Sequence, residues 1–208
     1  MKLSMLDPKI LITGTGRCGT SFLQSIFWKL GYFVAEDEKH KIMETPLPPD
    51  GTLEKPFQWN QRPYVMKSPG SSTLLARAIW KGEGEYYFAA LKHVLIPVRD
   101  PSYVAESHSR RGWQIAGVPR VIRENVSMAD QATWVLGNLV SALTYADTPF
   151  TLMDFPRMAE DCTYLHDMLI RSGVMRFNFE QFETAWSEVN KYGEAKGKSQ
   201  PDYEAGHW

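Results

Sequence analysis

The sequence predicts an α/β fold: a doubly wound, mostly parallel sheet of about five strands with helices on both faces. The first observation is that residues 9–35 read as an apolar strand, a glycine-rich turn, an amphipathic helix and a second short strand. This order is that of a βαβ unit, which requires a parallel sheet. The second observation is that strand-like and helix-like segments continue to alternate as far as residue 191. Parallel strands are covered on both faces and should be continuously apolar, as the first strand is.

The expected strands are short apolar runs that end at polar residues or turns. They cover residues 9–14, 32–35, 64–67, 93–98 and 150–154. Pro97 counts against the fourth of these strands, because proline cannot donate a hydrogen bond to a central ladder.

The expected helices combine apolar residues at helical spacing with capping signals. Gly31 ends the first helix. Asp100 followed by Pro101 is a typical helix start, and Ser127 with Asp130 opens the most regular helix of the chain. The helices are expected from residue 21 to 30, from 71 or 72 to about 81, from 101 to about 111, from 127 to about 145, near 161–171 and near 179–191.

Two stretches between these elements, residues 36–63 and 112–125, are broken by proline or glycine and read as irregular. From residue 194 onward the chain is polar and shows no period. We therefore expect one α/β domain over residues 1–193, followed by a flexible C-terminal tail over residues 194–208.

The composition narrows the classes of partner. A formal net charge of −1 gives no global reason to expect nucleic acid or an anionic membrane. Cys18 and Cys162 are the two cysteines, which argues against a disulfide scaffold and fits a reducing compartment. No run of about 18 apolar residues occurs, so we expect no membrane span, and residues 1–7 do not read as a signal peptide. We expect a cytoplasmic protein, and the oligomeric state stays open.

Residues 14–21 have the features of a phosphate-binding loop. Gly14, Gly16 and Gly19 let the backbone bend tightly, so that its N–H groups can converge on an anion. The helix that follows adds unpaired N–H groups and the positive end of its dipole. Lys67 and Arg99 follow two other strands, and ligands of a doubly wound sheet bind at the carboxyl ends of its strands. The three features together predict an anion site at that edge.

The loop departs from the standard nucleotide-binding pattern G-x-x-x-x-G-K-[ST]. Gly14 and Gly19 have the required spacing, but Thr20 stands at the position of the lysine. The cation of this loop is Arg17, three residues earlier. The departure argues against an ATPase or kinase, and a P-loop kinase or nucleotide hydrolase with a variant loop remains the alternative.

The stretch Gly14-Thr15-Gly16-Arg17-Cys18-Gly19-Thr20-Ser21-Phe22-Leu23 resembles the 5′-phosphosulfate loop of sulfotransferases that use 3′-phosphoadenosine 5′-phosphosulfate (PAPS). Val98-Arg99-Asp100-Pro101, with Ser107 eight residues after Arg99, resembles the element of that family that binds the 3′-phosphate. The strand at residues 150–155 and the helix after it resemble the late part of the family fold. The resemblance covers most of residues 9–173 and implies a P-loop type of doubly wound sheet.

The resemblance also implies roles for individual residues. Arg17 and Lys67 would stabilise charge on the oxygen that bridges sulfur and phosphorus, and the reaction would need no metal. Arg99 would bind the 3′-phosphate, a group that ATP lacks, through its planar guanidinium. Ser107 would add a hydroxyl donor to the same phosphate. The cofactor-binding set is Thr15, Gly16, Arg17, Cys18, Gly19, Thr20, Ser21, Arg99 and Ser107.

The general base does not follow the most familiar branch of the family. There a histidine stands two residues after the lysine, and here that position is Pro69. Branches that use a glutamate just beyond the second strand point to Glu36, with Glu38 and His40 as competitors. His108, next to Ser107, could face the acceptor, but we expect it on the surface of its helix.

The resemblance therefore predicts a sulfotransferase that moves the sulfuryl group of PAPS to an acceptor hydroxyl, or an amine, by in-line displacement. The acceptor would be a small molecule, a carbohydrate or a peptide, in a pocket built from residues 36–63 and 112–125. Because no histidine stands at Pro69, a binder of 3′-phosphoadenosine nucleotides without catalysis is a further alternative.

Overall fold

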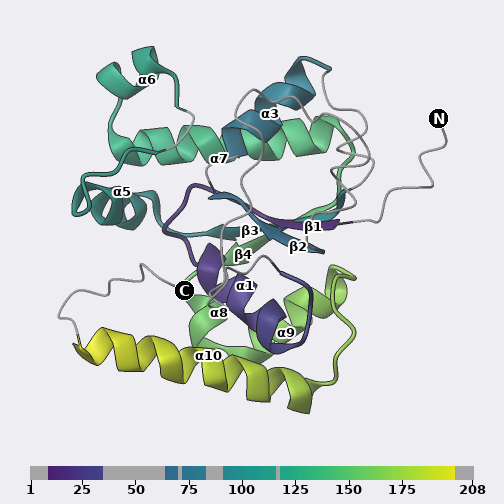
Figure 1. Ribbon diagram of the computed structural model, residues 1–208. Coiled ribbons are helices and arrows are strands. Elements are labelled where there is room, and N and C mark those ends of the chain that lie inside the picture. Colours follow the sequence, from purple (N-terminus) through teal and green to yellow (C-terminus); the bar gives the residue numbers. More distant parts are fainter. Residues whose placement is uncertain (1–8, 35–63, 70–71, 83–90, 116–117, 200–208) are drawn as a thin grey trace.

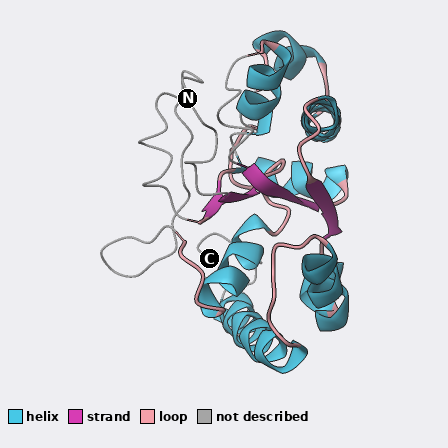
Figure 2. Ribbon diagram, turned by 90° about the vertical axis from the view of Figure 1, so that its right-hand side faces the viewer, coloured by secondary structure: helices cyan, strands magenta, loops and turns pink. Residues whose placement is uncertain are grey.

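The computed structural model describes residues 9–34, 64–69, 72–82, 91–115 and 118–199. In this part of the chain four parallel strands form one sheet, in the order β2-β1-β3-β4, with helices on both faces (Figures 1 and 2). The strands are β1 (Lys9–Ile12), β2 (Val65–Lys67), β3 (Leu91–Val98) and β4 (Phe150–Asp154). The predicted doubly wound α/β class is confirmed.

The second predicted strand, residues 32–35, is reduced to one parallel bridge between Val34 and Val65. The Val65 N–H donates to the Phe33 carbonyl over 3.0 Å. Val65 also pairs with Ile10 of β1, so Val34 adds to the opposite side of β2. Residue 35 lies outside the described part of the chain, so the five-strand expectation is met by four strands and this bridge.

The predicted helices are present, with small changes of boundary. They are α1 (Thr20–Lys29), α3 (Ser72–Trp80), α5 (Pro101–Ser109), α7 (Met128–Tyr145), α9 (Cys162–Arg171) and α10 (Phe179–Ser199). The capping signals act as expected. The Asp100 carboxylate accepts from the Ser102 N–H, and the Ser127 hydroxyl accepts from the Asp130 N–H.

Three helical features differ from the sequence prediction. Part of the stretch expected to be irregular forms the short helix α6 (Arg120–Asn125), stabilised by an ion pair of 2.5 Å between Arg120 and Glu124. The four-residue helix α8 (Arg157–Glu160) follows β4. Helix α10 runs to Ser199, beyond the helix end expected near residue 191. Its last turns contain alanine, glutamate and lysine, which favour helix without an apolar period, together with Gly193 and Gly197, which disfavour it.

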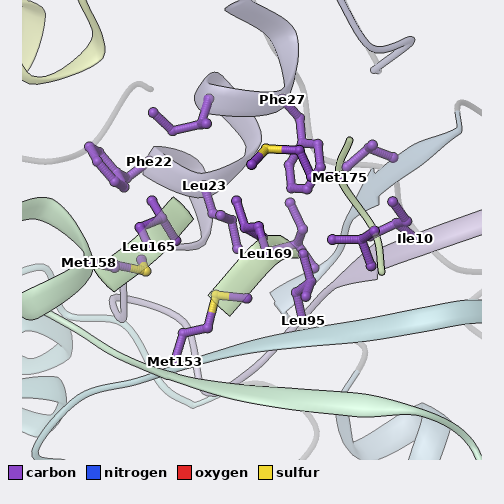
Figure 3. Close-up of a cluster of buried hydrophobic side chains, with 14 of the residues drawn as sticks. Ile10, Phe22, Leu23, Phe27, Leu95, Met153, Met158, Leu165, Leu169 and Met175 are labelled. Carbon is purple, nitrogen blue, oxygen red and sulfur yellow. The ribbon is translucent and has the colours of Figure 1, made fainter. Parts of the chain in front are cut away.

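Alternate residues of the central strands enter two apolar layers. Ile10 and Ile12 face the layer under α1, α9 and α10, whereas Leu11 faces the layer under α3 and α7. The first layer contains Leu23 of α1 and Leu165 of α9, packed over Met153 of the sheet (Figure 3). This packing holds α1 with its N-terminus at the carboxyl end of β1.

Pro97 is accommodated inside the sheet for a local reason. The Leu95 carbonyl accepts from Thr13 on the side of β1, while Val94 and Val98 bond on the side of β4. The backbone of Pro97, like that of Leu95, therefore faces β1. Pro97 lies beyond the last residue of β1, Ile12, which pairs with Leu95. The missing N–H removes no ladder hydrogen bond there.

Candidate functional site

The loop between β1 and α1 has the backbone shape that its glycines predict. Gly14, Gly16 and Gly19 have φ values of 152°, 76° and 88°, and Arg17 joins them with a φ of 57°. Gly19 is the N-cap of α1 and, lacking a side chain, offers no capping hydrogen bond to the first turn. The tight turn and the helix start thus combine in one place the two sources of anion attraction.

Two neighbouring segments pack closely on this loop. A Cβ on Gly14 would lie 3.3 Å from the Pro97 carbonyl oxygen. A Cβ on Gly19 would lie 2.5 Å from both the Phe155 ring and the Met158 methyl group. The end of β3 and the segment after β4 therefore require glycine at these positions and define the shape of the loop.

Arg17 connects the loop to the second predicted motif. Its Nε donates a hydrogen bond of 2.8 Å to Oγ of Ser107, 90 residues further along the chain. Both side chains are half-buried. Helix α5 and the loop leave the same edge of the sheet, which brings the two motifs together (Figure 1). The loop and Ser107 of α5 are thus in direct contact.

Lys67, at the end of β2, joins the same cluster. Its Nζ donates a hydrogen bond of 2.7 Å to Oγ of Ser21, in the first turn of α1. Lys67 is buried, at 5% exposure. The adjacent backbone is tied to β1, because the Thr13 hydroxyl donates to the Ser68 carbonyl over 2.9 Å and the Ser68 N–H donates to the Ile12 carbonyl. The ammonium group is therefore held at the N-terminus of α1.

Arg99 follows β3 and lies near two aromatic rings. The centre of its guanidinium is 5.3 Å from the Tyr103 ring and 5.4 Å from the Phe155 ring. Its Nε is buried and has no hydrogen-bond partner within the described residues. Phe155 also lies against Gly19, so one side chain links Arg99 to the loop between β1 and α1. A planar cation held in this way is suited to a bidentate anion.

The other predicted loop residues can act only in part through their side chains. Cys18 is fully buried, and burial raises the pKa of its thiol to about 11, so the thiol stays protonated at neutral pH. Thr20 is buried, and the Thr15 hydroxyl reaches the Gly16 carbonyl only over 3.4 Å. For these residues and Gly16, the contribution to an anion site would come mainly from backbone N–H groups.

His108 is placed differently from the sequence expectation. It is 6% exposed instead of lying on the helix surface, and its ring faces Gly16. Burial lowers the pKa of His108, and the charge of Arg17 lowers it further, while the Thr15 backbone raises it. The spacing from Val104, which is also buried, is the signal that puts His108 on the inner face of α5.

Trp113 lies in the 112–125 stretch expected to build the acceptor pocket, but the sequence analysis did not single it out. The guanidinium of Arg17 lies 5.9 Å from its ring centre, and that of Arg111 lies 5.0 Å away. The ring is about half exposed. It follows α5 in the irregular segment, where no periodic pattern points toward the loop.

The proposed base, Glu36, and its competitors Glu38 and His40 lie outside the described residues. Within the described residues, no cluster of three histidine, cysteine or acidic side chains could hold a metal ion. A search of the same residues finds no helix with the length and apolar character needed to cross a bilayer.

Comparison with known proteins identifies no family for this chain. No family model matches the sequence, and no curated protein matches it. Among solved structures, a sulfotransferase domain from the curacin biosynthetic pathway aligns with a TM-score of 0.44 at 12% identity. The alignment covers 85% of this chain and 77% of that chain. A similarity this weak carries no functional conclusion, so function must be inferred from the site.

Proposed function

We propose that the protein is a sulfotransferase that uses PAPS and transfers the sulfuryl group to an acceptor hydroxyl, or less favourably an amine. The observation that carries this proposal is the hydrogen bond of 2.8 Å between Arg17 and Ser107. Each residue belongs to one of the two motifs that resemble the PAPS-binding elements. Their contact supports a single site that binds two anionic groups of one nucleotide.

The cofactor would be held by backbone and side chains together. The loop N–H groups and Arg17 would bind the 5′-phosphosulfate at the start of α1. Arg99 would bind the 3′-phosphate through its planar fork, and Ser107 would add a hydroxyl. The buried Nε of Arg99, without a partner in the described residues, and its place near Tyr103 and Phe155 support this assignment.

When bound, PAPS supplies the sulfuryl group, whose bond to the 5′-phosphate oxygen breaks as the acceptor oxygen bonds to sulfur. Lys67 and Arg17 would stabilise the negative charge that develops on the departing oxygen, because both cations are held in advance by Ser21 and Ser107. A general base must take the acceptor proton, and we assign this role to Glu36, with Glu38 and His40 as competitors.

The interaction of Lys67 with Ser21 also bears on the kinase or hydrolase alternative. In the standard loop, the residue at the position of Ser21 places its hydroxyl on magnesium. Here that hydroxyl accepts a hydrogen bond of 2.7 Å from the Lys67 ammonium. A cationic side chain at this point supports charge stabilisation by the protein itself. The absence of histidine at Pro69 favours the non-catalytic binder instead, and turnover distinguishes the two.

Ligand-dependent stability tests the proposal first. A ligand at one hundred times its dissociation constant stabilises the folded state by about 2.7 kcal/mol. We expect 3′,5′-bisphosphoadenosine to raise the melting temperature and ATP with magnesium to raise it much less. The reverse order would contradict the sulfotransferase proposal and support the kinase or hydrolase.

Turnover tests the catalytic step. We expect release of 3′,5′-bisphosphoadenosine from PAPS in the presence of a panel of phenols, sugars and peptides. Glu36→Ala should keep the affinity for the bisphosphate and lose this turnover. An active Glu36→Ala protein would reject Glu36 as the base. A protein that binds PAPS but shows no turnover with any acceptor of the panel would be the non-catalytic binder.

A further inference from the structure

His108 lies where α5 meets the phosphate loop. It follows Ser107, the residue whose hydroxyl accepts from Arg17. Its imidazole is 6% exposed and faces Gly16. A Cβ on Gly16 would lie 3.4 Å from Nε2 and 3.6 Å from Cε1, so Nε2 is the ring atom nearest to the turn. Two consecutive residues of α5 thus contact two consecutive residues of the loop.

The ring has hydrogen-bonding capacity that the described residues do not fully use. Nδ1 and Nε2 are both buried, and neither has a hydrogen bond of good geometry there, although the Thr15 backbone lies near enough to the ring to raise its pKa. Every protonation state of imidazole carries at least one N–H. Nearly all buried polar groups in folded proteins are paired, so an unpaired donor beside a binding loop points to a group supplied by a ligand.

The complementary group is an anionic oxygen. The loop and the start of α1 present N–H donors, and Arg17 and Lys67 present cations. A ligand held by such groups brings acceptors, and a neutral imidazole matches them with its N–H. Burial and the charge of Arg17 both keep the ring neutral near pH 7.

We propose that His108 donates a hydrogen bond from Nε2 to an oxygen of the phosphate or sulfate group that binds in the loop. His108 would then be a direct ligand-binding residue of this site, in addition to Arg17 and Lys67. The inference rests on the proposed function only in that both require an anion at residues 14–19.

Isothermal titration with 3′,5′-bisphosphoadenosine tests the donor. His108→Phe fills the space of the ring without an N–H, whereas His108→Gln keeps a side-chain N–H near the position of Nε2. We expect the Phe variant to weaken binding at least about tenfold, and the Gln variant to stay within about threefold of wild type. His166→Phe is the matched control, because His166 also has a buried Nε2 without a partner but packs against Phe179 and Phe182.

Nitrogen-15 NMR of the histidine rings reads the hydrogen bond in the wild-type protein, and His108→Gln serves to assign the signal. We expect one Nε2–H to become hydrogen-bonded when the bisphosphate saturates the site, and its signal to be missing from His108→Gln. A His108 ring that is unchanged by the ligand, or already bonded to the Thr15 backbone without it, overturns the inference.

The outcomes separate this inference from the proposed function. If wild type binds the bisphosphate and His108→Phe binds it equally well, this inference alone fails. If wild type prefers ATP with magnesium and His108→Phe loses that affinity, the proposed function fails and this inference stands. If wild type binds neither nucleotide nor inorganic pyrophosphate, both fail together. Equal loss in the Phe and Gln variants also overturns the role of the N–H.

Discussion

Replacing Gly19 by alanine tests how closely the loop is packed. Gly19 is the N-cap of α1 and has a φ of 88°, in the left-handed region. An added Cβ would lie 2.5 Å and 2.8 Å from two atoms of the Phe155 ring and 2.5 Å from the end of Met158. The methionine end is flexible, but the phenylalanine ring also lies 5.4 Å from the guanidinium of Arg99. The ring can therefore give way only by disturbing the site.

Gly31, just beyond the other end of α1, is the matched control. Its φ is 79°, and a Cβ there would meet nothing within 4 Å. Gly31→Ala should therefore cost only the left-handed strain, about 1–2 kcal/mol. Gly19→Ala should cost the same left-handed backbone strain and about 1–3 kcal/mol more for overpacking. The two terms together make about 2–5 kcal/mol.

Urea unfolding followed by circular dichroism measures both free energies of unfolding, and titration with 3′,5′-bisphosphoadenosine measures binding. We expect Gly19→Ala to be the less stable variant and to bind the bisphosphate much more weakly, while Gly31→Ala binds as wild type does. Equal destabilisation of the two variants would show that Phe155 and Met158 do not press on the loop, and would refute the reasoning.

Three further predictions concern Lys67, Ser107 and the buried histidines. Lys67→Met keeps the apolar stem and removes the ammonium, so PAPS turnover should fall by about 10²–10³-fold while the Kd for the bisphosphate changes far less; equal losses in both would assign Lys67 to binding only. Ser107→Ala removes the hydrogen bond to Arg17 and should weaken bisphosphate binding about fivefold or more in calorimetry. Ser109 is exposed, and Ser109→Ala should have no effect on binding. A Ser107→Ala protein that binds normally would contradict a single site formed by the loop and α5. Burial lowers the pKa values of His93 and His108, so below about pH 6.5 the unfolded chain binds more protons than the folded one. The free energy of unfolding should therefore decrease from about pH 7.5 to about pH 5.5, and His108→Phe should make this decrease smaller. An unchanged pH dependence in His108→Phe would contradict the pKa shift at His108.

Much of the site was predictable because it depends on local pattern and topology. Apolar runs that end at Lys67 and Arg99, together with the turn after β1, place all three at one edge once the strands are parallel. Arg99 follows β3 and Ser107 lies in α5, the helix that comes directly after it. The positions of the two residues relative to each other therefore depend on local backbone structure only.

What the sequence could not predict depends on contacts across the fold. The burial of His108 is decided by the loop packed against α5, and the roles of Phe155 and Trp113 by rings that lie in irregular segments. The bond from Lys67 to Ser21 requires the exact height of β2 relative to α1. Helix α10 extends past residue 191 through a stretch with no apolar period, so the pattern used for prediction could not find its end.

The central claim is that the loop and the Arg99–Ser107 segment bind the two phosphates of one nucleotide. Isothermal titration of wild type and Arg99→Ala with 3′,5′-bisphosphoadenosine and with AMP, which lacks the 3′-phosphate, tests it most directly. We expect wild type to bind the bisphosphate at least about tenfold more tightly than AMP, and Arg99→Ala to bind the two alike. Equal affinity of wild type for both nucleotides, or a preference that survives in Arg99→Ala, would contradict the account.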